Sequence, residues 1–313
     1  MARVARLKFS GQDGWYHIHS RVAGCRGEYP LSSPAATRRL IEMIEHFSRV
    51  YFCEVAGFCV MGNHYHLIVR FDGERPVDRE ELLARARIMY PGRSGGMFVD
   101  AWDDEQWEHY RRRLFDVSEY MRNIQAAYAR WYNRSHERRG RFWADRFKSV
   151  VLGDERAVQD CLLYVELNGV RAGLVERPEE WHGCSAYLRE IGKDGWLMSL
   201  EGLLNQPSGK KALVEFRELL YYRGAVPSRE GQAAISREVL EREIARGFAS
   251  SGVYLRRLGY FVDGLAIGTG QFIRDQLAVM RDEGRYLRRK NPISQLGGVH
   301  LSLREQRSHA IVF

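Results

Sequence analysis

The first half of the chain alternates between strand-like and helix-like patterns of apolar and polar residues. Residues 15–22 alternate in the manner of a strand, and residues 34–50 place apolar side chains at helical intervals. Two adjacent strands are predicted over 51–61 and 64–71, joined by the short polar turn Gly62-Asn63. The predicted order of this region is therefore strand, helix, strand, strand.

A second helix and a fourth strand complete this pattern. Residues 72–100 are polar and rich in glycine, and we interpret them as a connecting stretch. Aromatic and aliphatic residues at helical intervals predict a helix over 117–134, and residues 146–152 have the pattern of a strand. The order β-α-β-β-α-β is the split plan of ferredoxin-like folds. We therefore expect an α+β domain that has an antiparallel sheet with helices on one face.

The rest of the chain is predicted to be mainly helical. A helix is expected over 154–168, with Asp154 as its N-cap and Gly169 at its end. Helix-breaking residues accumulate from Gly192 onward, so we place a boundary between a domain at 1–192 and an extension at 193–313. Three helical patterns and then a basic segment lie within this extension, at 212–222, 236–249, 270–280 and 285–290.

Composition narrows the class of protein. Of the 313 residues, 45% are hydrophobic and 28% are charged, which is typical of a soluble globular protein and excludes disorder of the whole chain. No apolar run approaches the roughly 18 residues that a membrane span needs, and no secretory signal can be recognised. The cytoplasm is therefore the expected location. The five cysteines (Cys25, Cys53, Cys59, Cys161 and Cys184) form no CxxC pair, so we expect reduced thiols.

The net charge is concentrated in one segment. The chain has 48 Lys and Arg against 40 Asp and Glu, a formal charge of +8. Residues 111–149 alone contain eleven Lys and Arg against four Asp and Glu, an excess of seven. Such a concentration of positive charge favours a polyanionic partner.

The sharpest local motif is His64-Tyr65-His66 at the start of a predicted strand. Residues two apart on a strand point to the same face, so the two imidazoles would lie side by side and could bind one divalent metal ion. A pair of ordinary strand histidines would give the same pattern, and the motif alone does not separate the two interpretations.

Tyr164 and Asn168 could complete such a site. They are four residues apart on a predicted helix, at the edge of the apolar stripe that packs on the sheet. A tyrosine near a metal ion is a candidate nucleophile, with a phosphodiester as its natural electrophile. Forming its phenolate at pH 7 costs on the order of 4 kcal/mol, which a neighbouring cation or base must offset. Alone, Tyr164 would be interpreted as a packing residue.

Three segments together resemble a known family. GFCVMGNHYHLI at 57–68, GRFWADRFKS at 140–149 and YVELNGVRAGLV at 164–175 resemble, in order and spacing, the single-tyrosine His-hydrophobe-His transposases. The branch they resemble most is the REP-associated tyrosine transposases, over about residues 15–190. The resemblance implies a ferredoxin-like nuclease that cuts single-stranded DNA near a hairpin. Such an enzyme forms a 5′-phosphotyrosine and releases a 3′-hydroxyl.

The resemblance also assigns roles to single residues. His64 and His66 match the metal-binding histidines, and Tyr164 matches the nucleophile. Asn168 stands where relatives carry a polar ligand, often Gln, and its carbonyl oxygen can still reach Mg²⁺ or Mn²⁺ with a side chain one methylene shorter. For the second pair of alternating histidines, His17 and His19, a position near the metal is open, but we favour a structural or substrate-facing role.

We expect the DNA contacts to come from the basic segment. Arginine and lysine would neutralise phosphates, and a tryptophan would stack on unpaired bases. The candidates are Arg139, Arg141, Trp143, Arg146 and Lys148. For the aromatic residues of the helix at 117–134, packing in the core is the better interpretation. The expected partner is single-stranded or hairpin DNA in the nucleoid, and a homodimer is left open.

Two other classes of function compete with this hypothesis. One is a descendant that binds hairpin DNA but no longer cuts it, and the presence of His64, His66, Tyr164 and Asn168 together argues against that loss. The other is a nuclease of the replication-initiator or relaxase kind. The Tyr-x-x-x-Asn pattern on a helix that follows the histidine strand argues against this class. A metalloenzyme unrelated to nucleic acids would leave the basic segment unexplained.

Overall fold

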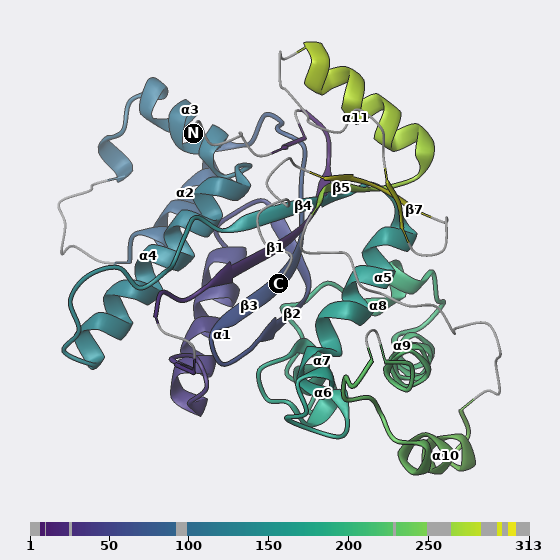
Figure 1. Cartoon of the computed structure of the whole chain (residues 1–313). Helices are drawn as coiled ribbons and strands as arrows, with labels where there is room; N and C mark the ends of the chain where they lie inside the picture. Colours follow the sequence, from purple (N-terminus) through teal and green to yellow (C-terminus); the bar gives the residue numbers. More distant parts are fainter. Residues whose placement is uncertain are drawn as a thin grey trace.

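A computed structural model describes residues 7–9, 11–24, 27–91, 99–227, 230–248, 264–282, 293–295 and 300–304. Its centre is one mixed sheet with the strand order β2-β3-β1-β4-β5-β7-β6 (Figure 1). The strands are β1 (Gly14–Arg21), β2 (Cys53–Val60), β3 (His64–Phe71), β4 (Lys148–Leu152), β5 (Gly264–Gly268), β6 (Ile293–Gln295) and β7 (His300–Arg304). The predicted basic segment at 285–290 and Cys25 lie outside the described residues.

Helices surround the sheet on both sides. In chain order they are α1 (Pro34–Ser48), α2 (Arg79–Met89), α3 (Asp104–Arg113), α4 (Val117–Ser135), α5 (Glu155–Glu166), α6 (Asn168–Arg171), α7 (Ser185–Glu190), α8 (Leu200–Leu204), α9 (Gly209–Gly224), α10 (Arg237–Ala245) and α11 (Gly270–Asp282). Two short 3₁₀ helices, η1 (Val99–Ala101) and η2 (Pro178–Glu180), complete the set.

The first four strands confirm the ferredoxin-like prediction. Their order β2-β3-β1-β4, with antiparallel pairing throughout and with α1 and α4 as the two helices of the split plan, is the expected topology. α1 starts where predicted, because the Ser33 hydroxyl accepts a hydrogen bond from the Ala36 amide (3.2 Å) and Pro34 occupies the first turn. Asp116 caps α4 in the same way, accepting from the Ser118 amide (2.6 Å).

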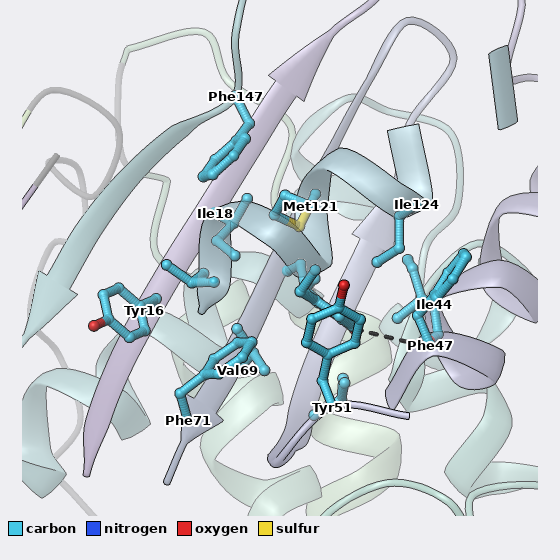
Figure 2. Close-up of a cluster of buried hydrophobic side chains, with 14 of the residues drawn as sticks. Tyr16, Ile18, Ile44, Phe47, Tyr51, Val69, Phe71, Met121, Ile124 and Phe147 are labelled. Carbon is cyan, nitrogen blue, oxygen red and sulfur yellow. Dashed lines mark hydrogen bonds between the residues drawn. The ribbon is translucent and has the colours of Figure 1, made fainter. Parts of the chain in front are cut away.

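One hydrophobic core fills the space between the sheet and α1 and α4. Residues on alternate positions of β1 and β3, such as Tyr16, Ile18, Val69 and Phe71, point into it and are buried (Figure 2). The helices contribute the other half, with residues that include Ile44, Phe47, Met121 and Ile124. This face of the sheet is therefore occupied by apolar packing, which leaves the opposite face for chemistry.

α5 packs on that opposite face, over a second core (Figure 1). It approaches β2 closely at Gly57, where a β-carbon would come within 2.4 Å of Leu162 Cδ1 and 2.9 Å of Ser185 Oγ. A β-bulge between Val55 and Gly57 accompanies this approach. α1 and α4, the two helices of the ferredoxin-like unit, lie on one face of the sheet as expected. α5, the helix that carries Tyr164, lies on the other face.

The C-terminal extension contains its predicted helices and also adds to the sheet. α9, α10 and α11 cover the three predicted helical patterns. β5 pairs parallel to β4, and β7 and β6 continue the sheet beyond it, which the sequence pattern did not predict. Both sides of the predicted boundary between residues 192 and 193 therefore contribute strands to the same sheet.

The polar stretch between β3 and α4 is more regular than predicted. It forms α2, η1 and α3 where we expected a connecting stretch, while residues 92–98 are outside the described part. α3 begins with a capping box in which Asp103 and Gln106 bond each other's backbone amides. Within the ranges that the structure describes, none of the helices is both long and apolar enough to cross a membrane.

Candidate active site on the α5 face of the sheet

Four histidines of two neighbouring strands lie on the face of the sheet that α5 covers. β1 pairs with β3 so that His19 is directly opposite His66 and Arg21 is opposite His64. Side chains alternate along both strands, so His17 and His19 share this face with His64 and His66. The sequence motif supplies two of these imidazoles, and the strand pairing adds the other two.

His66 is the most enclosed of the predicted metal ligands. Its side chain is 3% exposed, and its Nδ1 lies 3.0 Å from Nε2 of His17, which is fully buried. Burial, together with the neighbouring imidazoles, lowers the pKa of His66 well below its usual value. His66 is therefore a neutral imidazole at pH 7, which is the form that binds a metal ion.

His64 lies at the start of β3, next to the turn. Its Nδ1 is 2.8 Å from Oδ1 of Asn63, and its ring centroid is 5.3 Å from that of His66. Burial and the positive charge of Arg21 lower the pKa of His64 to about 4. Both histidines of the motif thus have a hydrogen-bond partner at Nδ1, and both are uncharged at neutral pH.

Tyr164 reaches this histidine face from α5. Its ring centroid lies 5.7 Å from that of His66 and 6.1 Å from that of His17, edge-on to both. The guanidinium carbon of Arg171 lies 5.6 Å from the centre of the Tyr164 ring. A tyrosine, two imidazoles and a guanidinium group therefore lie close together, although they come from β1, β3, α5 and α6.

A buried carboxylate two residues after Tyr164 fixes the position of α5. Glu166 is fully buried, accepts a hydrogen bond from the Ala186 amide (2.9 Å), and accepts another from the Ser185 hydroxyl. Ser185 Oγ in turn accepts from the Phe58 amide of β2 (2.9 Å). Burial raises the pKa of Glu166. This network ties the tyrosine helix to the strand beside β3.

Asn168 lies at the junction of α5 and α6. Its side-chain amide nitrogen donates to the backbone carbonyls of Tyr164 and Val165, at 3.0 Å each. The nitrogen is thereby held against the end of α5, and the oxygen Oδ1 is the side-chain atom suited to a cation. The structure places Asn168 at the first residue of α6, whereas we expected it to be the last residue of the tyrosine helix.

The candidate donors for a divalent cation such as Mg²⁺ or Mn²⁺ are two imidazole nitrogens and one amide oxygen. Among the residues the structure describes, no group of three or more His, Cys, Asp or Glu side chains could hold a metal ion. A metal ion at His64 and His66 would thus take its other ligands from amide oxygen, water and phosphate, which are ligands that these hard cations accept.

A comparison with solved structures finds a similar chain. The structure is similar to that of a REP-associated tyrosine transposase bound to a REP hairpin. The two share 15% sequence identity, and the match covers 63% of this chain and 89% of the other, with a TM-score of 0.41. No family model and no curated protein match this sequence.

The predicted DNA-contacting residues fall into two groups. Arg139, Arg141, Arg146 and Lys148 are exposed, and Lys148 of β4 pairs with His19, which brings it to the edge of the histidine face. Trp143 is only 8% exposed, and its Nε1 donates to the Gln125 carbonyl (2.9 Å). It packs against Tyr65 with ring centroids 5.5 Å apart, so its position is that of a core residue.

The sequence does not reveal the contacts of two contributors to the site. For His17 it favours a structural or substrate-facing role, and the structure places this residue against His66 and Tyr164. The alternation of His17 and His19 shows in the sequence that both side chains lie on one face of the strand. Only the strand register reveals which histidine of β3 each one lies beside. Arg171 is part of the third matching segment, and it lies over the Tyr164 ring from the end of α6, beyond the break in the helix at Leu167.

The lowered pKa of His64 predicts a specific dependence of stability on pH. Between pH 6.5 and about 4 the unfolded chain binds a proton at His64 that the folded protein does not bind. The free energy of unfolding should therefore fall as the pH is lowered through this window, by up to about 1.4 kcal/mol per pH unit for this residue.

Urea denaturation of the metal-free protein at several pH values measures this effect. The variant His64→Gln should show a smaller fall in stability across the window than the wild type. His109→Gln, on the exposed surface of α3, serves as the control and should leave the fall unchanged. An equal slope in the wild type and His64→Gln would contradict the assigned environment of His64.

Proposed function

We propose that this protein is a metal-dependent endonuclease and strand transferase for single-stranded DNA, with Tyr164 as its nucleophile. The observation that carries the proposal is the meeting of Tyr164 with His66, at 5.7 Å between ring centroids, on the face that also holds His64. The three matching sequence segments supply the two histidines, the tyrosine and the basic segment. The substrate they favour is hairpin or repeat DNA.

The reaction is a transfer of a phosphodiester to Tyr164. The phenolic oxygen bonds to phosphorus as the bond from phosphorus to the 3′-oxygen breaks, which leaves a 5′-phosphotyrosine and a 3′-hydroxyl. The phenol loses its proton in this step, and the leaving 3′-oxygen gains one. The Arg171 guanidinium beside the Tyr164 ring favours the developing phenolate, whose formation at pH 7 costs on the order of 4 kcal/mol.

His64, His66 and Asn168 would hold the divalent cation, Mg²⁺ or Mn²⁺. When bound, the ion polarises the scissile phosphate and neutralises charge that develops on it. The burial of His66 and the partner on each Nδ1 keep the two imidazoles neutral and oriented before the ion arrives. Glu166 holds the tyrosine helix over this face, so the position of the nucleophile relative to the metal ligands is fixed.

The DNA strand would reach the site along the exposed basic residues Arg139, Arg141, Arg146 and Lys148. The pairing of Lys148 with His19 supports a path that ends at the histidine face. Arginine and lysine neutralise phosphates without reading the sequence of bases. The buried Trp143 is left out of this surface and keeps a packing role.

The substitution Tyr164→Phe tests the assignment of the nucleophile. We expect the wild type to form a covalent adduct with labelled hairpin DNA from the flanks of its gene in Mg²⁺ or Mn²⁺, but not in EDTA. The Phe variant should form none, because it lacks the attacking oxygen, and should bind the DNA within about threefold of wild type. Denaturing gels, followed by mass spectrometry of the adduct, give both results.

Tyr222→Phe, on α9, is the matched control and should form the adduct as the wild type does. An adduct that persists in Tyr164→Phe would remove Tyr164 from the role. Tight binding by the wild type with no adduct in either metal would identify instead a descendant that binds hairpins without cutting them.

The salt dependence of DNA binding tests the proposed surface. The logarithm of the affinity for single strands should fall with the logarithm of salt concentration, by about 0.7 for each phosphate neutralised. Changing Arg139, Arg141, Arg146 and Lys148 together to Gln should lower this slope by about 2 to 3. Fluorescence anisotropy at several salt concentrations measures the slope.

The control removes the same charge from the exposed basic residues of α9 and α10, with Lys210, Lys211, Arg237 and Arg242 changed to Gln. Its slope should match that of the wild type. A control that loses as much slope as the test variant would move the DNA path to the C-terminal extension.

A further inference from the structure

His17 contacts the predicted metal ligand His66 through one hydrogen bond. β1 places His17 opposite Ile68, so it is the diagonal neighbour of His66 across the strand pair. The Nε2 atom of His17 lies 3.0 Å from Nδ1 of His66, and the two rings are nearly parallel, with an angle of 16° and centroids 5.2 Å apart. Both side chains are buried, so water does not compete for this bond.

A hydrogen bond between two imidazole nitrogens requires one donor and one acceptor. The nitrogen of His66 that could face a metal ion is Nε2, because its Nδ1 is occupied by His17. Nε2 can bind a cation only if the proton of the ring is on Nδ1. His66 must then donate from Nδ1, and Nε2 of His17 must accept.

The second histidine of the motif is held in the same way. Nδ1 of His64 lies 2.8 Å from Oδ1 of Asn63, which can only accept a hydrogen bond. The ring of His64 therefore carries its proton on Nδ1 and presents Nε2. The two histidines have different partners, an imidazole and an amide, but the same atom of each ring is fixed.

We propose that His17 is a positioning residue that fixes the tautomer and the ring orientation of His66, so that Nε2 of His66 is ready to bind the metal ion. This inference rests on the proposed function for the role of His66 as a ligand. Partners of this kind commonly change metal affinity by about 10- to 100-fold when they are removed. His17 itself is not a ligand in this arrangement, because the nitrogen it turns toward the site accepts from His66.

Two substitutions separate positioning from packing. His17→Phe keeps a buried planar ring but removes the acceptor. His17→Gln can return an acceptor oxygen near the place of the imidazole Nε2. His109→Phe, on the exposed surface of α3, is the control for loss of a histidine.

The first measurement is the tautomer of His66 in the metal-free protein, from nitrogen NMR of protein labelled with ¹⁵N-histidine. The His66 signals can be assigned with the variant His66→Gln. We expect the proton on Nδ1 in the wild type and in His17→Gln, and a shift toward Nε2 in His17→Phe. A wild-type His66 with its proton on Nε2 would overturn the proposal, whether or not the protein cuts DNA.

The second measurement is the affinity for Mn²⁺ alone, by isothermal titration calorimetry. His17→Phe should bind about 10- to 100-fold more weakly than the wild type, and His17→Gln should recover most of that loss. Equal affinity in His17→Phe and the wild type would overturn the proposal. A wild type that binds no Mn²⁺ would overturn the proposed metal dependence, while the tautomer of His66 would still decide what His17 does.

Discussion

The antiparallel pairing of β1 with β3 is the constraint on which the site depends. It places His19 opposite His66 and brings His17 within hydrogen-bond distance of His66. The same register points Tyr16 and Ile18 into the core under α1 and α4. A slip of one residue would exchange the two faces, burying the histidines under α1 and α4 and turning the apolar core residues toward α5. The apolar packing on one face therefore enforces the position of the imidazoles on the other.

The position of α5 is fixed separately from the sheet. Gly57 allows the helix to approach β2, and Glu166 bonds to the start of α7, which itself bonds to β2. A buried carboxylate is costly unless it is hydrogen-bonded, and Glu166 accepts hydrogen bonds from Ser185 and Ala186 and lies near the charge of Arg189. The polar network thus fixes one placement of the helix and with it the position of Tyr164.

The C-terminal strands β5, β7 and β6 continue the sheet beyond β4, at the edge opposite to β2.

Much of the fold was predictable because its periodicities are strong. β3 begins and ends where the alternation predicted, and α4 differs from its predicted range by one residue. α2 was missed because only Leu82 and Ala86 of its residues are buried, which makes a weak apolar stripe. β5 begins and ends with glycine and has only three residues between them, so its pattern is too short to identify.

The site was predictable only in part, for a different reason. His64, His66 and Tyr164 stand in recognisable motifs, but the partners of these side chains depend on the strand register and on how α5 and α6 meet at Leu167. His17 could therefore be noticed in the sequence, and its contact with His66 could not. Trp143 shows the converse problem, because a tryptophan among arginines fits both base stacking and core packing, and only its burial separates them.

The central claim is that the α5 face of the sheet binds a divalent metal ion at His64 and His66, beside Tyr164. Crystals grown with Mn²⁺ and measured at a wavelength where manganese scatters anomalously test it most directly. The account predicts an anomalous peak within bonding distance of Nε2 of both histidines. A well-ordered structure without a peak there, or with Mn²⁺ bound only elsewhere, would contradict it.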